Sequence, residues 1–212
     1  MKLNIYVEGG AKKQKDLNIS CRRGFKAFVE KAGIPGEKVQ FIPRFGRENV
    51  FTVFRKAVPS DPKCLLLIDS EVPIRAAHAC KVDGSGGLPW EHLKLREGDK
   101  HWQKPTQADS THCHFMVECM ENWFLADRDT LQKYFRDNFQ TSQLPGAAQV
   151  ETVSKLAVLD ALKKATKDCS RGCYDKGPHS FEILELVHPD RVCKVSPWAK
   201  RFIETVKQRI SA

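Results

Sequence analysis

Three short apolar runs, at residues 3–7, 39–43 and 64–68, alternate with two stretches of helical periodicity at the start of the chain. In residues 20–32 and 47–58, apolar side chains recur at the i, i+3, i+4 and i+7 spacing of an amphipathic helix. The run at 64–68 is continuously apolar, which is typical of a central strand that is covered on both faces. The order strand, helix, strand, helix, strand predicts a parallel sheet with right-handed crossovers.

This regular alternation stops after the third predicted strand. Residues 72–112 contain the glycine-rich run DGSGG and several prolines, and their length predicts a functional loop inserted into the domain. A fourth strand is predicted at residues 114–117, and further helices are predicted at 128–135, 151–167, 179–187 and 197–210. We therefore expect an α/β domain over residues 1–140 and a helical C-terminal extension over residues 141–212, packed on the same core.

Composition limits the classes of protein that remain. The apolar runs are far shorter than the roughly 20 residues that a membrane span needs, and no signal-peptide pattern follows Met1. We therefore expect a cytoplasmic protein without a membrane partner. The eight cysteines include no CxxC pair, which argues against a zinc ribbon and fits reduced thiols. No segment matches G-x-x-x-x-G-K-[ST], so the chain itself should not hydrolyse ATP through a P-loop.

Acidic residues follow two of the predicted strands. Glu8 comes directly after the first strand and before two glycines, and Asp69 and Glu71 come after the third. We expect these carboxylates to lie close together, because ligands of open α/β sheets bind where the carboxyl ends of the strands meet. Like charges held together need a neutralising partner. Carboxylate oxygens suit Mg²⁺ or Mn²⁺ better than zinc, so a metal site is predicted at Glu8, Asp69 and Glu71.

The chain is basic, with a formal net charge of +9. Residues 1–79 contain 15 Lys and Arg against 8 Asp and Glu, so most of the surplus surrounds the predicted metal site. A basic surround favours a polyanionic partner, and metal ions held by carboxylates can clamp the reacting oxygens of a phosphodiester. The basic residues that we expect to contact nucleic acid are Lys12, Lys13, Arg22, Arg23 and Arg47.

Together, the order of these motifs resembles a known domain. A Glu-Gly after the first strand and an Asp-x-acidic pair after the third are similar to the Toprim domain, the metal-binding module of topoisomerases, bacterial primases and several nucleases. The segments VEGG, CRRGF, LLIDSE, MVECMENWFLAD and YDKGPHSF resemble a family of small stand-alone Toprim-like proteins. Some of these proteins are encoded beside ABC-type ATPases in bacterial defence systems. The resemblance extends over nearly the whole chain and implies a Toprim-like, Rossmann-like sheet.

The resemblance also implies roles for individual residues. Glu8 would be a metal ligand or a general acid–base group, and Asp69 and Glu71 would hold Mg²⁺ or Mn²⁺. Glu121 would be a further acidic catalytic residue, and Lys176 would stabilise charge on the phosphate. The commonest Toprim pair is Asp-x-Asp, so Glu71 departs from the pattern. Plainer interpretations are that Glu121 is a surface charge of a helix and that Lys176 is a solvated loop lysine.

Two functions follow as expectations. The first is a metal-dependent nuclease acting on DNA or RNA, as the effector of an antiviral system with an ABC-type or AAA-type ATPase partner. The alternative is a catalytically inactive Toprim-like subunit that binds an ATPase or nucleic acid, which the departure at Glu71 favours. Both leave open whether the chain forms a homo-oligomer.

Overall fold

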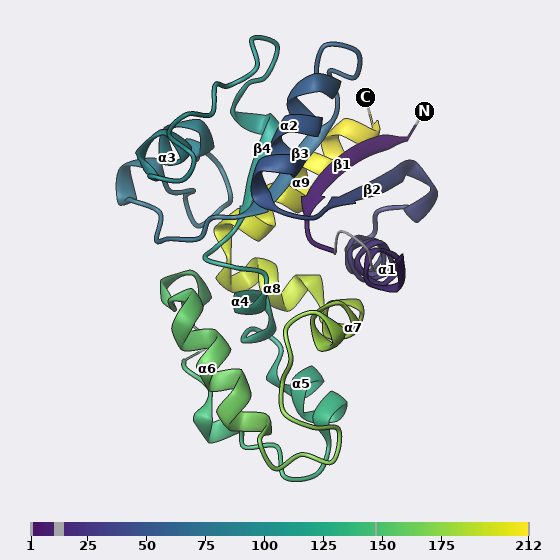
Figure 1. Ribbon diagram of the computed structural model, residues 1–212, viewed down its shortest axis with the longest axis vertical. Coiled ribbons are helices and arrows are strands. Elements are labelled where there is room, and N and C mark those ends of the chain that lie inside the picture. Colours follow the sequence, from purple (N-terminus) through teal and green to yellow (C-terminus); the bar gives the residue numbers. More distant parts are fainter. Residues whose placement is uncertain (1, 11–14, 147, 212) are drawn as a thin grey trace.

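The computed structural model describes residues 2–10, 15–146 and 148–211, which are organised around a four-stranded sheet (Figure 1). The strands are β1 (Leu3–Glu8), β2 (Val39–Arg44), β3 (Leu65–Asp69) and β4 (Cys113–Met116). All four run parallel, in the order β2-β1-β3-β4, and Tyr6 of β1 is level with Ile42 on one side and Leu66 on the other. The predicted α/β class, with a parallel sheet flanked by helices, is therefore confirmed.

Helices cover both faces of this sheet. Helices α1 (Lys15–Lys31) and α9 (Pro197–Ser211) lie on one face, and α2 (Arg47–Ala57) and α3 (Pro89–Leu95) lie on the other. The central strand β3 is buried along its whole length. Leu65 and Leu67 join the core on the α1 side, whereas Leu66 and Ile68 join the core on the α2 side. A strand covered on both faces needs apolar side chains at successive positions, which explains the unbroken apolar run.

A second group of helices lies at the carboxyl ends of the strands (Figure 1). It comprises α4 (Glu121–Phe124), α5 (Arg128–Phe135), α6 (Lys155–Thr166), α7 (Pro178–Leu186) and α8 (Pro189–Val195). Their apolar side chains continue the core of the α1 side. Trp123 of α4, for example, stacks on Phe28 of α1 with 5.0 Å between the ring centroids. This packing fixes the helical group against the edge of the sheet where the predicted site lies.

Several helices begin at other residues than predicted, because apolar periodicity alone does not define where a helix begins. Helix α1 begins at Lys15 instead of residue 20, and Leu17 in its first turn packs against the core. Helix α6 begins only at Lys155, because Ser154 caps it by accepting a hydrogen bond from the backbone N of Ala157. Helix α8 was not predicted as a separate element, although Pro189 at its first position is a common helix start.

The predicted insertion, residues 72–112, contributes several buried side chains to the core on the α2 side. It contains α3, and the indole of Trp102 stacks on Phe51 with 4.0 Å between the ring centroids. The indole N of Trp90 donates to the backbone oxygen of Asp109 at 2.8 Å. Both tryptophans are buried, which supports packing rather than ligand contact as their role.

The C-terminal residues return to the sheet. Helix α9 packs against β4 and β1, and its Phe202 and Val206 are fully buried in the core of the α1 side. Trp198 of the same helix is buried in the core of the α2 side. Residues beyond 141 thus pack on the same core as the sheet. Within the described ranges, no helix is both long enough and apolar enough to cross a membrane.

Candidate functional site

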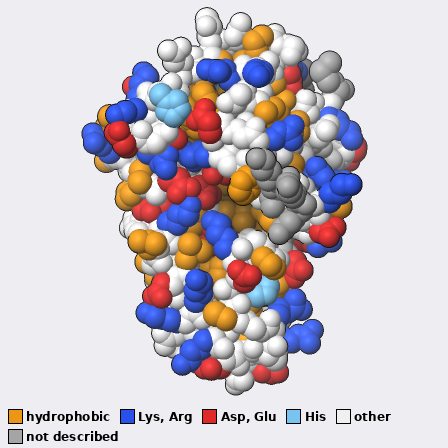
Figure 2. All heavy atoms as spheres, viewed as in Figure 1, with side chains coloured by type: hydrophobic (Ala, Val, Ile, Leu, Met, Phe, Trp, Pro, Cys, Tyr) orange, Lys and Arg blue, Asp and Glu red, His pale blue; other side chains and the backbone are white. Residues whose placement is uncertain are grey.

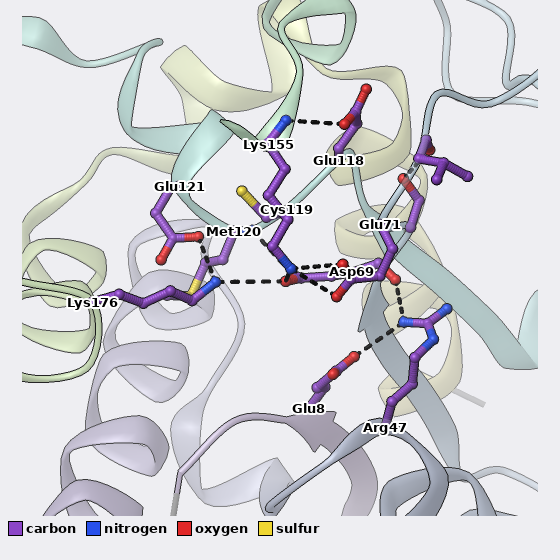
Figure 3. A network of polar contacts seen from close by, with 12 residues as sticks. Glu8, Arg47, Asp69, Glu71, Glu118, Cys119, Met120, Glu121, Lys155 and Lys176 are labelled. Carbon is purple, nitrogen blue, oxygen red and sulfur yellow. Dashed lines mark hydrogen bonds and ion pairs between the residues drawn. The ribbon is translucent and has the colours of Figure 1, made fainter. Parts of the chain in front are cut away.

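The carboxylates predicted as a metal site meet in one pocket at the carboxyl ends of β1 and β3. Glu8, Asp69 and Glu71 line a cavity of about 360 Å³, together with Lys155 and Lys176. Figure 2 shows acidic, basic and hydrophobic side chains meeting around a hollow in the middle of one face. Figure 3 shows that the side chains of Lys155 and Lys176 point toward Asp69 and that Arg47 points toward Glu8. The strand ends therefore converge as expected from the order of the strands.

Glu8 is held in place at the end of β1. Its Oε2 lies 3.1 Å from Nη1 of Arg47, and about 20% of its side chain is exposed. The next residue, Gly9, leaves little room for a side chain, since a Cβ atom would lie 3.1 Å from Sγ of Cys21 and 3.2 Å from the ring of Phe181. The Glu-Gly pair thus combines a pocket carboxylate with a close approach of the backbone to α1 and α7.

A lysine joins the two acids at the carboxyl end of β3. Nζ of Lys155 lies 2.7 Å from both carboxylate oxygens of Glu71 and 3.5 Å from Oδ2 of Asp69. Oδ1 of Asp69 accepts a hydrogen bond from the backbone N of Met120 at 3.1 Å. Glu71 has a φ of 67°, a conformation that a non-glycine residue seldom adopts, and its backbone N donates to the oxygen of Glu118 at 2.9 Å. Contacts with the segment after β4 therefore hold Asp69 and Glu71 at the pocket.

No motif predicts a role for Lys155. It is the first residue of α6, and its backbone N donates to Oε2 of Glu118 at 2.9 Å. Ser154, as an N-cap residue, is a sequence signal for the start of this helix, but it does not reveal what the helix start faces. Although burial opposes its charge, Asp69 and Glu71 raise the pKa of Lys155 above its ordinary value, so the side chain is a cation.

A buried ion pair supports Glu8. The guanidinium of Arg47, the first residue of α2, makes three hydrogen bonds of 2.8 to 3.0 Å to the carboxylate of Asp99. The side chains of Arg47 and Asp99 are only 12% and 1% exposed. Nη1 of Arg47 also donates to Glu8 and to the backbone oxygen of Asp69. The structure thus places Arg47, a predicted nucleic-acid contact, inside the site, where it positions Glu8. No sequence signal identified Asp99.

Glu121 and Lys176 form a second pair beside the carboxylates. Glu121 is fully buried, and its Oε1 accepts a hydrogen bond from the hydroxyl of Tyr174 at 2.9 Å. Nζ of Lys176 lies 3.2 Å from Oε2 of Glu121 and 3.9 Å from Oδ2 of Asp69. The plainer interpretation of Glu121 as a surface charge is therefore wrong. Lys176 is half exposed but belongs to the same network, and Tyr174 is a member that was not predicted.

Electrostatics keep this second pair charged. Burial opposes ionisation of Glu121, but Lys176 and hydrogen bonds from neighbouring groups hold the pKa of Glu121 below its ordinary value. Burial likewise opposes the charge of Lys176, but Glu121 and Asp69 raise the pKa of that lysine. The pocket therefore presents an ammonium group next to carboxylates at neutral pH.

Burial disfavours the ionised form of the Asp69 carboxyl group. Burial raises its pKa to about 7, and the nearby carboxylates of Glu8 and Glu121 add to this effect against Lys176 and Lys155. Because the folded state binds this proton more tightly than the unfolded state does, stability is lost as the pH rises from about 4 to about 7. We expect Asp69→Asn, which cannot ionise, to be more stable than the parent protein at pH 8 and to lose that advantage near pH 4.

Thermal unfolding of both proteins between pH 4 and pH 8 measures this difference. Asp109→Asn provides a control of opposite sign, since hydrogen bonds from Thr111 and His112 outweigh burial and lower the pKa of Asp109 to about 2. The Asp109 carboxylate contributes stability above its unfolded pKa, so its removal should destabilise the protein at pH 8. An Asp69→Asn variant that loses stability relative to the parent toward pH 8 would contradict the prediction.

Two further predicted nucleic-acid contacts, Arg22 and Arg23, do not belong to the lining of this pocket. Both are exposed on α1. Nε of Arg23 pairs with Oε2 of Glu185 at 2.6 Å. Lys12 and Lys13 lie outside the described residues.

The donor chemistry of the pocket fits a hard divalent cation, since Glu8, Asp69 and Glu71 all contribute carboxylate oxygens. Among the residues that the structure describes, however, no three Asp, Glu, His or Cys side chains are arranged to hold a metal ion together. Glu8 is paired with Arg47, and Glu71 with Lys155. A cation bound by all three carboxylates would therefore have to replace the ammonium of Lys155.

Comparison with known proteins places the chain in a family. The fold and the pocket define an α/β protein with a polar site at the carboxyl edge of a parallel sheet. The model of the family described as Domain of unknown function (DUF4276) matches residues 7–207, and the chain belongs to this family. The match includes the four strand ends and both lysines of the pocket. Searches of curated proteins and of solved structures found no match.

Proposed function

We propose that the protein is a metal-dependent nuclease that hydrolyses phosphodiester bonds of DNA or RNA. The observation that carries this proposal is the meeting of Glu8, Asp69 and Glu71 in one recessed pocket, beside the ammonium groups of Lys155 and Lys176. Carboxylates recruit a divalent cation, and ammonium groups attract a phosphate. This combination suits phosphodiester hydrolysis better than chemistry on a neutral substrate.

Each residue of the pocket would have its own role in this reaction. Glu8, Asp69 and Glu71 would hold Mg²⁺ or Mn²⁺, which when bound supplies charge stabilisation for the phosphate. Lys176 is half exposed and lies 3.9 Å from Asp69, so it would place its positive charge beside a phosphate held there. Glu121 would keep Lys176 in position and charged. Arg47 would keep Glu8 turned toward the pocket.

A cleavage assay tests the proposal. The protein is incubated with single-stranded and duplex DNA, RNA and tRNA, in Mg²⁺ or in Mn²⁺, and matched reactions contain EDTA. We expect fragments of at least one substrate with the divalent ion and none with EDTA. Cleavage that is equally fast in EDTA would contradict the role of a metal. If no substrate is cut, the second candidate function takes the place of the first.

The second candidate is a catalytically inactive subunit that binds an ATPase partner or nucleic acid. The position of Lys155 favours it, because Nζ of this lysine lies 2.7 Å from both oxygens of Glu71. The lysine thus already supplies a positive charge where a metal would be bound. The two candidates differ in whether a divalent cation can displace this ammonium group.

Removing the ammonium group of Lys155 is expected to increase the affinity for Mn²⁺ at least about tenfold. A cation within 4 Å of a carboxylate contributes several kcal/mol at the effective dielectric constant near a protein surface, on the order of 4 kcal/mol at a dielectric constant of 20. Lys155→Met removes this competitor while it keeps most of the aliphatic chain. Isothermal titration of Mn²⁺ into the parent and the variant measures the change without any need for activity.

Lys163→Met is the matched control, because Lys163 is an exposed residue of the same helix and does not line the pocket. We expect its Mn²⁺ affinity to equal that of the parent. Equal affinities of Lys155→Met and the parent would show that this lysine and the metal do not compete.

We further propose that the nuclease works in the cytoplasm with an ABC-type or AAA-type ATPase, as the effector of an antiviral defence system. This rests on the resemblance of the segments around Glu121 and Lys176 to Toprim-like proteins that are encoded beside such ATPases. All eight cysteines are free thiols, which is typical of proteins in a reducing compartment.

A further inference from the structure

The pocket that holds the carboxylates also has hydrophobic side chains in its lining. Leu17, Phe45, Met116, Met120 and Phe181 contribute to it. Three of them are buried, namely Met116, Met120 and Phe181, whereas Phe45 is 54% exposed. Packing in the core therefore explains the buried side chains but does not explain the large aromatic ring at Phe45.

The backbone on both sides fixes the position of Phe45 next to the strand end that carries Glu8. Arg44 is level with Glu8 in the pairing of β1 with β2, and its oxygen accepts a hydrogen bond from the backbone N of Gly9 at 3.2 Å. Two residues after Phe45, Arg47 is bound to Glu8 and Asp99. An exposed aromatic ring on a loop that is held at both ends is a preformed contact surface at the rim of the site.

We infer that Phe45 stacks on the base of an unpaired nucleotide, and that the substrate of this site is single-stranded or locally unpaired nucleic acid. The inference rests on the proposed function and adds the form of the substrate. Base–aromatic stacking is available to every base and is the common device of proteins that bind single strands. In a duplex the base is stacked inside the helix and cannot reach Phe45 unless it is extruded.

The depth of the site supports the same conclusion. The side chain of Asp69 is only 10% exposed, so a phosphate must enter the pocket to reach it. The cavity of about 360 Å³ is at the small end of the range for ligand pockets and is of the size that holds one nucleotide rather than a double helix. A flexible single strand can place a phosphate in such a recess while its base lies on Phe45 at the rim.

Binding measured in EDTA separates this inference from catalysis. Fluorescence anisotropy is recorded with labelled single-stranded DNA, single-stranded RNA and duplex DNA of one length at one salt concentration, because electrostatic affinity depends on salt. We expect the parent to bind single strands more tightly than duplex. Phe45→Ala should weaken single-strand binding roughly tenfold, whereas Phe45→Trp should retain it. Comparison of the affinities for single-stranded DNA and single-stranded RNA shows whether the site prefers deoxyribose or ribose.

Leu95→Ala is the matched control, because Leu95 is exposed to a similar extent, 51%, and does not line the pocket. It should bind like the parent.

The inference is overturned if Phe45→Ala binds single strands as tightly as the parent, or if duplex binds as tightly as single strands. Metal-dependent cleavage would still support the nuclease in that case. Phe45-dependent binding of single strands without cleavage would retain the stacking contact, as part of a nucleic-acid-binding subunit, and remove the nuclease. Failure to bind any of the three nucleic acids would overturn the inference, whatever the cleavage assay shows.

Discussion

Replacing Asp69 by asparagine is expected to lower the rate of metal-dependent cleavage at least about 100-fold, similar to the loss of one group that stabilises transition-state charge in other enzymes. Asparagine keeps the shape of the side chain and an oxygen that can accept the hydrogen bond from Met120, so the fold should persist. It lacks the negative charge that would attract a divalent cation. Initial rates of the parent and the variant at saturating Mg²⁺ measure the loss.

Glu118→Gln is the control for this prediction. Glu118 is buried, but its carboxylate accepts from the backbone N of Lys155 and does not line the pocket. Glutamine can accept the same hydrogen bond, so we expect cleavage within about threefold of the parent.

Glu71→Gln tests the departure from the Asp-x-Asp pattern, and we expect a loss of cleavage rate close to that of Asp69→Asn. An Asp69→Asn variant that cuts like the parent would remove the carboxylate site from the mechanism.

Replacing Arg47 by methionine is expected to lower the free energy of unfolding by roughly 3–5 kcal/mol, the range for removal of one partner from a buried ion pair. Its guanidinium makes three hydrogen bonds to Asp99, which is 1% exposed, and the variant would leave that carboxylate buried with the ion pair to Arg96 but without the one to Arg47. Glu8 would lose its ion-pair partner as well. Urea denaturation of the parent and the variant measures the difference.

Two comparisons make this prediction specific. Arg23→Met removes an exposed ion pair with Glu185, and we expect a change below about 1 kcal/mol. In Arg47→Met combined with Asp99→Leu, the buried carboxylate that lost Arg47 is gone as well, so part of the lost stability should return. A change below about 1 kcal/mol for Arg47→Met alone would show that this pair does not hold the site together.

The pocket combines charges in a way that costs stability. Burial, with the negative charge of Glu71, raises the pKa of Glu8 against the effect of Arg47, and burial also raises the pKa of Asp69. Lys155 and Lys176 offset part of this repulsion. Carboxyl groups with pKa values raised in this way are more common at functional sites than at purely structural positions.

Local patterns of apolar residues along the chain were sufficient to predict the fold class. The apolar run before Asp69 predicts a central strand because a strand covered on both faces needs apolar side chains at every position. The alternation of strands and helices then predicts a parallel sheet, and its geometry brings Glu8 and Asp69 to the same edge. These conclusions follow because the spacing of apolar residues and the handedness of crossovers are local properties.

The partners of these carboxylates were decided by tertiary packing. Lys155 lies 84 positions after Glu71, and Asp99 lies 52 positions after Arg47, so no local spacing connects them. Lysine and aspartate are also too common for their identity alone to indicate a contact. The pairing arises only when the start of α6 meets the carboxyl end of β3 and the insertion packs on α2. The sequence determined where the acidic groups of this protein meet, and the tertiary structure decided which cations share the pocket with them.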